Sequence, residues 1–124
     1  MTKPAPAIRG GRNVAMKVPP HLWEQTVAFY RDVLRLPEIT AHAPEVGFEF
    51  GANQLWIDRV PHISQAELWL EVTTDDIGAT GRMLSDAGIV RCDDIEPLGE
   101  SARAFWIMNP ASIVHLVCPA DAAW

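Results

Sequence analysis

The chain has 124 residues, 48% of them hydrophobic, and a formal net charge of −6 at pH 7. This length and apolar content suffice for one domain, or for two half-domains that share a core. The acidic residues are scattered and no basic stripe is present, which argues against nucleic acid as a partner. No apolar run approaches the roughly 20 residues that cross a bilayer, which argues against a membrane partner.

The N-terminal segment 1–12 and the two cysteines bear on location. Residues 1–12 are rich in Pro, Ala and Gly and lack an apolar centre, so we interpret them as a flexible lead-in and not as a secretory signal. Cys92 and Cys118 fit no metal-binding spacing, and two thiols without an export signal indicate the reducing cytoplasm. We expect both to be small core or surface residues, with a catalytic cysteine as the alternative.

A first module is predicted over residues 13–60. Residues 13–18 alternate between polar and apolar side chains, which is the period of a half-buried strand. Apolar residues at helical spacing then predict a helix that ends near Pro37; they are Trp23, Val27, Tyr30 and Leu34. Strand patterns follow at 46–50 and 55–59, with a turn at 51–53 between them.

A second module is predicted over residues 66–119, after a linker at 61–65 and before a tail at 120–124. Residues 67–72 repeat the alternation of residues 13–18. Thr73 and Asp76 resemble a capping box at the start of a helix, and Gly88 is placed to cap its end. Strand patterns at 104–108 and 113–117, joined by a turn at 109–112, complete the repeat.

The repeat predicts an α+β fold of two β-α-β-β-β modules with curved mixed sheets. One face of each sheet packs on its helix, and the other face needs cover from the other module, a second subunit or a ligand. We therefore expect a cleft.

Several segments resemble the vicinal oxygen chelate superfamily, which includes glyoxalase I, bleomycin-resistance proteins, fosfomycin-resistance enzymes and extradiol dioxygenases. The segments are Val27–Leu34, Glu71–Val72 with Asp75–Ile77, and Phe105–Pro110 running into Ile113–Leu116. The resemblance covers residues 13–119 and implies this fold and a homodimer, without deciding whether the dimer exchanges modules. It does not imply one reaction, because the fold hosts lyases, isomerases, transferases, dioxygenases and binding proteins.

The resemblance also implies where a metal would be held. Metal-dependent members take ligands from the first and last strands of each module, mostly His and Glu respectively. Three of these positions fall on Asn13, Glu67 and His115. The fourth falls on Ile57 or on Asp58, and the choice matters because a register slip of one residue turns every side chain of the strand to the other face. Oxygen and imidazole ligands suit Mn, Fe, Co, Ni or Zn.

The departures from that pattern favour a protein without a metal cofactor. Neither first strand carries the usual His, and His115 stands where Glu is usual. We therefore expect a metal-independent, bleomycin-resistance-like protein that binds a small organic molecule. The alternative is a metal-dependent lyase, isomerase or dioxygenase that uses Glu67 and His115 with Asp58 or Asn13, so whether the chain is an enzyme stays open.

Other residues are assigned to the cleft by their place in the strands. Lys17 and Glu71 occupy equivalent positions of the two modules, either as an anion contact and a general base or as a structural ion pair. Trp69 shares a strand face with Glu67 and Glu71, so these residues, with Lys17 and His115, are the predicted contacts of a planar or cationic ligand. Trp69 is equally placed to anchor a dimer interface. Trp56 and Trp106 are expected in the core or an interface, and His42 in a solvated loop.

Overall fold

The computed structural model describes residues 5–99 and 102–122, so the ends of the predicted lead-in and tail, 1–4 and 123–124, lie outside the described residues. The chain divides into two compact units. The first unit is Arg12–Trp69, and the second combines the segment up to Gly11 with the segment from Leu70 onward. Among the described helices, none is long and apolar enough to cross a membrane.

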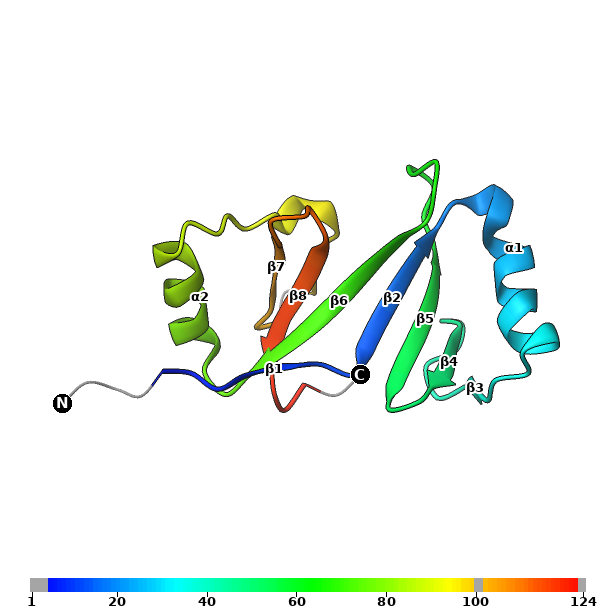
Figure 1. Cartoon of the computed structure of the whole chain (residues 1–124), viewed down its shortest axis with the longest axis horizontal. Helices are drawn as coiled ribbons and strands as arrows, with labels where there is room; N and C mark the ends of the chain where they lie inside the picture. Colours follow the sequence, from blue (N-terminus) through cyan, green and yellow to red (C-terminus); the bar gives the residue numbers. More distant parts are fainter. Residues whose placement is uncertain (1–4, 100–101, 123–124) are drawn as a thin grey trace. The chain divides into compact units, whose positions relative to one another are not determined.

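The first unit is a mixed sheet with one helix (Figure 1). Its elements are β2 (Asn13–Val18), α1 (Pro20–Ala28), a π-helical turn η1 (Phe29–Val33), β3 (Glu38–Ile39), β4 (Gly47–Phe50), β5 (Asn53–Arg59) and the start of β6 (Glu67–Thr74). The strands lie in the order β3-β4-β5-β2-β6. β2 and β5 are parallel, and the other neighbours are antiparallel.

The core of the first unit lies between this sheet and α1. Its buried residues are Val18, Val27, Phe48, Leu55 and Ile57. The indole Nε1 of Trp23 on α1 donates a hydrogen bond of 3.0 Å to the carbonyl oxygen of Ile57, which ties the helix to β5. The predicted packing of the helix on one sheet face is confirmed for this unit.

The predicted apolar face of the first helix is right for its first three positions and wrong for Leu34. The amide of Leu34 donates to the carbonyl of Phe29, five residues back, and the amide of Leu36 donates to the carbonyl of Tyr30. This wider turn shifts the phase of the following side chains. Leu34 is therefore 47% exposed, and Leu36 packs against the core in its place.

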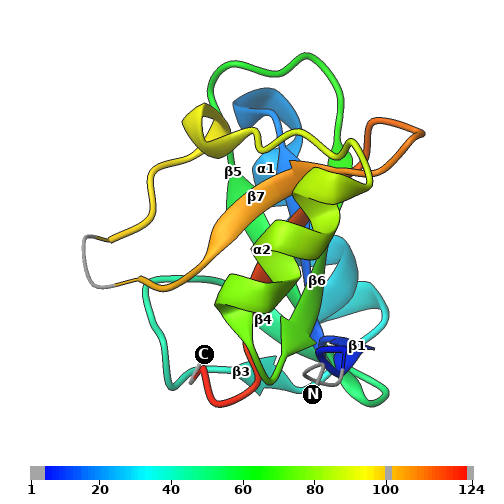
Figure 2. The ribbon, with the colours of Figure 1, turned by 90° about the vertical axis from the view of Figure 1, so that its left-hand side faces the viewer.

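The second unit has its own mixed sheet and helix (Figure 2, where α2 and β7 face the viewer). Its elements are β1 (Ile8–Gly10), the rest of β6, α2 (Ile77–Asp86), a 3-10 turn η2 (Asp93–Ile95), β7 (Phe105–Met108) and β8 (Val114–Pro119). β8 pairs in parallel with β6 and antiparallel with β7, and β1 pairs antiparallel with β6. A single bridge between Arg91 and Ile107 stands where the repeat predicts a further strand.

Two predicted boundaries are wrong. Residues 8–10 are not a flexible lead-in, because they pair with residues 72–74 and the amide of Ala7 donates to Asp75 Oδ1 at 2.8 Å. The linker does not separate the modules either, because Glu67–Trp69 at the start of β6 pair with β2 and so belong to the first unit. In both cases strand pairing joins segments that are far apart in the sequence.

Both ends of α2 are capped, and the N-terminal cap is Asp76 and not the predicted Thr73. Asp76 is the N-cap, and its Oδ1 accepts a hydrogen bond of 2.9 Å from the amide of Ala79. Thr73, the predicted cap, lies within β6. Gly88 follows the helix with a φ of 82°, a left-handed conformation that glycine adopts without strain, as its predicted capping role requires.

We predict that Asp76→Ala lowers the free energy of unfolding by about 1 kcal/mol, because it removes the acceptor for an otherwise unpaired helix amide. Urea denaturation monitored by circular dichroism measures the effect. Asp86→Ala, which removes an exposed carboxylate from the other end of α2, is the control and should change stability little. Equal effects of the two substitutions would contradict the capping role.

Candidate functional site: the helix-free face of the first unit

The sheet of the first unit has a second face, opposite α1, that carries most of the predicted site residues. Side chains alternate across a strand, so the paired registers decide which residues share this surface. We call it the helix-free face and define it by Asn13, Ala15, Lys17, Gly47, Glu49, Gln54, Trp56, Asp58, Glu67 and Trp69.

The pairing of β2 with β5 settles the register that the sequence left open. Met16 lies opposite Ile57, and Lys17 lies opposite Asp58. Ile57 is 2% exposed and belongs to the core beneath α1. Asp58 therefore projects from the helix-free face, and Ile57 from the opposite one.

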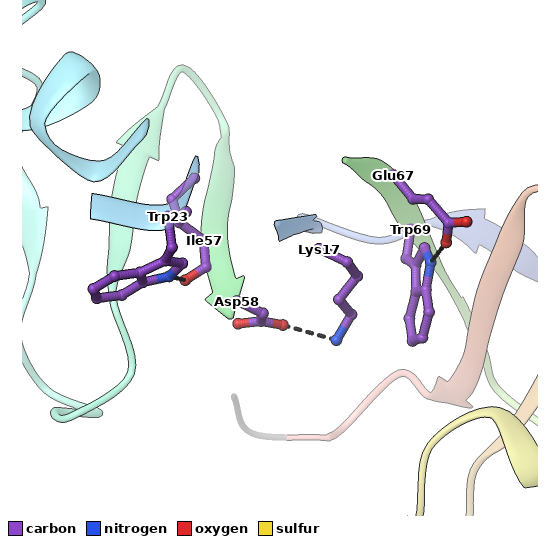
Figure 3. A network of polar contacts seen from close by, with 6 residues as sticks. All are labelled: Lys17, Trp23, Ile57, Asp58, Glu67 and Trp69. Carbon is purple, nitrogen blue, oxygen red and sulfur yellow. Dashed lines mark hydrogen bonds and ion pairs between the residues drawn. The ribbon is translucent and has the colours of Figure 1, made fainter. Parts of the chain in front are cut away.

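Lys17 lies at the centre of a polar network on this face (Figure 3). Its Nζ is 2.8 Å from Asp58 Oδ2 and 4.3 Å from the ring centroid of Trp69. The indole Nε1 of Trp69 in turn donates a hydrogen bond of 3.0 Å to Glu67 Oε2. Lys17 is 3% exposed and Trp69 is 7% exposed, so the ammonium covers the indole and both are buried. Asp58 is thus a partner of Lys17, and Glu71 belongs to the other unit.

Trp56 forms a second aromatic feature of the face. A Cβ atom added to Gly47 would lie 2.5 Å from the six-membered ring of the Trp56 indole, so the ring packs directly on the glycine. At its other end, Trp56 Nε1 donates to Asn13 Oδ1 at 2.8 Å. The His42 ring lies edge-on, with a centroid distance of 5.8 Å. Trp56 is half-buried and not a core residue. The alternation of residues 54–58 could have shown this, whereas the contact with His42 had no signal in the sequence.

Glu71 belongs to the second unit and is 8% exposed there. The side chain of Glu71 lies so close to Gly11 that a Cβ atom at position 11 would overlap it. Burial raises the pKa of the Cys118 thiol to about 12, and the nearby Glu71 carboxylate adds to this rise. A thiol that stays protonated in this way is a poor nucleophile, which argues against a catalytic cysteine at position 118.

The expectation that His115 faces the same side as Glu71 is wrong. Leu70 lies opposite His115, and Glu71 lies opposite Leu116. Opposed residues of neighbouring strands share a face and consecutive residues do not, so His115 and Glu71 project from opposite faces of this sheet. His115 also lies opposite Ile107, which lines a surface hollow together with residues of α2.

Trp106, the remaining strand tryptophan, was expected in the core or in an interface, and it is a core residue. It is 6% exposed, and its Nε1 donates a hydrogen bond of 2.9 Å to the carbonyl oxygen of Glu96.

Asn13 and Asp58, the two alternatives proposed to complete a metal site with Glu67 and His115, are both engaged with other partners. Asn13 pairs with Gln54, four residues before Asp58, so Asn13 and Asp58 are separated by about 13 Å along the strands. Asn13 Oδ1 already accepts hydrogen bonds from Gln54 Nε2 and Trp56 Nε1, and Asp58 already pairs with the Lys17 ammonium. Within residues 5–99 and 102–122, no three His, Cys, Asp or Glu side chains converge.

Comparison with known proteins places this geometry in a known fold. Methylmalonyl-CoA epimerase from Mycobacterium tuberculosis superposes with a TM-score of 0.59 at 16% identity, covering 90% of this chain and 88% of that one. A glyoxalase/bleomycin resistance protein/dioxygenase superfamily member from Vibrio splendidus 12B01 superposes with a TM-score of 0.56 at 13% identity, covering 91% and 99%. The Mn(II)-bound glyoxalase from Novosphingobium aromaticivorans gives 0.57 at 18% identity, covering 90% of this chain and 41% of that longer one.

The chain therefore has the glyoxalase/bleomycin resistance protein/dioxygenase fold, an α+β architecture. No protein-family model and no curated protein sequence matches it. At these identities the likeness concerns the fold and not the reaction.

We predict that Lys17→Met lowers the free energy of unfolding by about 1–3 kcal/mol, between the values typical of exposed and of buried ion pairs, because it leaves the Asp58 carboxylate without its cation. Urea denaturation measures the loss. The double variant Lys17→Met/Asp58→Asn should lose less than the sum of the single variants. Arg31→Met, which breaks the exposed pair with Asp32, is the control and should change stability little. Additive single losses would contradict the pairing.

We predict that a thiol reagent such as dithionitrobenzoate modifies Cys92 but not Cys118 in the folded protein near pH 8. Cys118 is 1% exposed and its thiol pKa is about 12, so little thiolate forms. The folded Cys92→Ala variant should therefore be unreactive until urea is added. Fast modification of native Cys92→Ala would refute the buried thiol.

The free energy of unfolding should also depend on pH through Cys118. Because an unfolded thiol ionises near pH 8.5, the contribution of the neutral Cys118 thiol to this free energy should be lost as the pH rises from about 9 through 12.

Proposed function

We propose that the chain is a metal-independent protein that binds a small, planar, cationic organic molecule on the helix-free face, in the manner expected of a bleomycin-resistance-like protein. The observation that carries this proposal is the seating of Trp56. Its indole rests on Gly47 and is held by the hydrogen bond from Nε1 to Asn13. A ring held at both ends loses little side-chain freedom when a planar ligand stacks on it.

The charges of the helix-free face support a cationic ligand. Glu49, Asp58 and Glu67 bring carboxylates to this face, against the ammonium of Lys17. The Lys17 ammonium already covers the ring of Trp69. We therefore assign the stacking role to Trp56 in place of Trp69, with Glu49 on the neighbouring strand as the charge that attracts the ligand.

The distribution of side chains also argues for binding over chemistry. A general base needs a carboxylate or imidazole that is free to take a proton from a bound molecule. On this face Asp58 is engaged with Lys17, and Glu67 accepts the indole hydrogen bond of Trp69. The third carboxylate, Glu49, is the one that we assign to attracting the ligand. The metal-dependent alternative has the fold in its favour, but both residues offered to complete its ligand set, Asp58 and Asn13, already have other partners.

We predict that planar aromatic cations such as ethidium raise the melting temperature and quench tryptophan fluorescence, whereas neutral and anionic naphthalenes do so less. Ligand at a hundredfold excess over its Kd stabilises the folded state by about 2.7 kcal/mol. Trp56→Leu should weaken binding about tenfold, consistent with the loss of one stacking contact. Glu49→Gln should weaken the binding of cations but not that of neutral ligands. Glu24→Gln on the exposed side of α1 is the matched control. If no class of ligand binds, or if Trp56→Leu binds normally, the proposal fails.

Elemental mass spectrometry of protein purified without chelator or affinity tag separates this function from the metal-dependent alternative. We expect substoichiometric Mn, Fe, Co, Ni and Zn, also after reconstitution. A near-stoichiometric metal that disappears in His115→Ala would support the enzyme instead and direct assays to substrates with two adjacent oxygens.

A further inference from the structure

Lys17 lies in a row of charged residues that crosses three neighbouring strands. It is opposite Asp58 on β5, where the pairing is parallel, and opposite Glu67 on β6, where the pairing is antiparallel. All three side chains project from the helix-free face. The lysine thus stands between two carboxylate-bearing residues, with one strand spacing of about 4.8 Å on each side.

An anion and an aromatic ring both contact the ammonium group in this row. Nζ pairs with Asp58 Oδ2 at 2.8 Å and lies 4.3 Å from the centroid of the Trp69 ring. Trp69 is itself held by its hydrogen bond to Glu67 (Figure 3). Removing a lysine from water is costly unless it is paired, and here an anion and an aromatic face both compensate its charge.

We propose that Lys17 is the resident cation of this face. Its ammonium supplies the positive charge that carboxylates on adjacent strands otherwise obtain from a bound divalent ion, and it thereby excludes such an ion from the row. The engagement of Asp58, one of the predicted metal ligands, is then a consequence of the chain carrying its own cation. This proposal does not depend on which small molecule the protein binds.

The proposal implies that removing the ammonium creates a weak metal site. Without Lys17, the carboxylates of Asp58 and Glu67 flank an uncharged position, with Cα atoms about 10 Å apart across two strand spacings. Both side chains extend from the same face, and Glu67 reaches the vacated place once its carboxylate releases the hydrogen bond from Trp69 Nε1. Two carboxylates with water are a typical ligand set for Mg²⁺, Ca²⁺ or Mn²⁺, and a site without further protein ligands binds at about millimolar concentration.

The experiment is a Mn²⁺ titration followed by thermal melting, with free Mn²⁺ counted by electron paramagnetic resonance. Wild-type protein and Lys17→Arg, which keeps the cation, should bind no Mn²⁺ up to about 1 mM. Lys17→Met should bind Mn²⁺ and regain part of its lost melting temperature. The double variant Lys17→Met/Asp58→Asn should lose this response. Arg59→Met removes a positive charge from the exposed end of β5 and is the control for a general change in net charge; it should not respond.

Two results would overturn the proposal. One is a wild-type protein that binds Mn²⁺ and loses it on Asp58→Asn, because the row would then accept an ion beside Lys17. The other is a folded Lys17→Met variant that shows no Mn²⁺ binding. If Lys17→Met does not fold, Lys17→Gln replaces it with a polar, uncharged side chain and is judged by the same two measurements. A lack of ligand binding in wild-type protein would count against the proposed function alone.

Discussion

The parallel pairing of β2 with β5 is the constraint on which the described site depends. Its register places Met16 opposite Ile57 and Lys17 opposite Asp58. Because side chains alternate across a strand, this one choice sends Ile57 into the core beneath α1 and Asp58 to the helix-free face. A shift by one residue would bury the aspartate against the helix and leave the lysine without this anion. Core packing and charge pairing therefore both select the same register.

The second unit repeats this register with different chemistry. Leu70 opposite His115 and Glu71 opposite Leu116 reproduce the two pairs of the first unit. An aspartate in one unit therefore corresponds to a leucine in the other, and the position of His115 corresponds to that of the buried Ile57. The two units thus share the register of their strands. The Lys17–Asp58 ion pair of the first unit, however, corresponds to Glu71 opposite Leu116 in the second, which is not an ion pair. This explains why a shared fold gives little information about the reaction.

Charge balance on the helix-free face links the binding proposal to the proposal for Lys17. The lysine neutralises Asp58 and covers Trp69, so it removes one carboxylate and one aromatic ring from those available to a ligand. What is left is Trp56, seated on Gly47, with Glu49 on the neighbouring strand. The absence of a side chain at Gly47 has the same importance as the indole, because a Cβ there would displace the ring.

The sequence alone was sufficient to predict the repeat, the α+β class and most of the strands, because these follow from local periodicity in residues such as Val14, Met16 and Val18. It also identified Lys17, Asp58, Glu67 and Trp69 as residues of one surface or candidates for it. It could not decide between Ile57 and Asp58, nor exclude His115 from the face of Glu71, because strand register depends on which residues pair across long sequence distances. Only the tertiary structure decided three further features, because each joins segments whose proximity no local pattern encodes. They are the strand at Ile8–Gly10, the place of Glu67–Trp69 in the first unit, and the contact of His42 with Trp56.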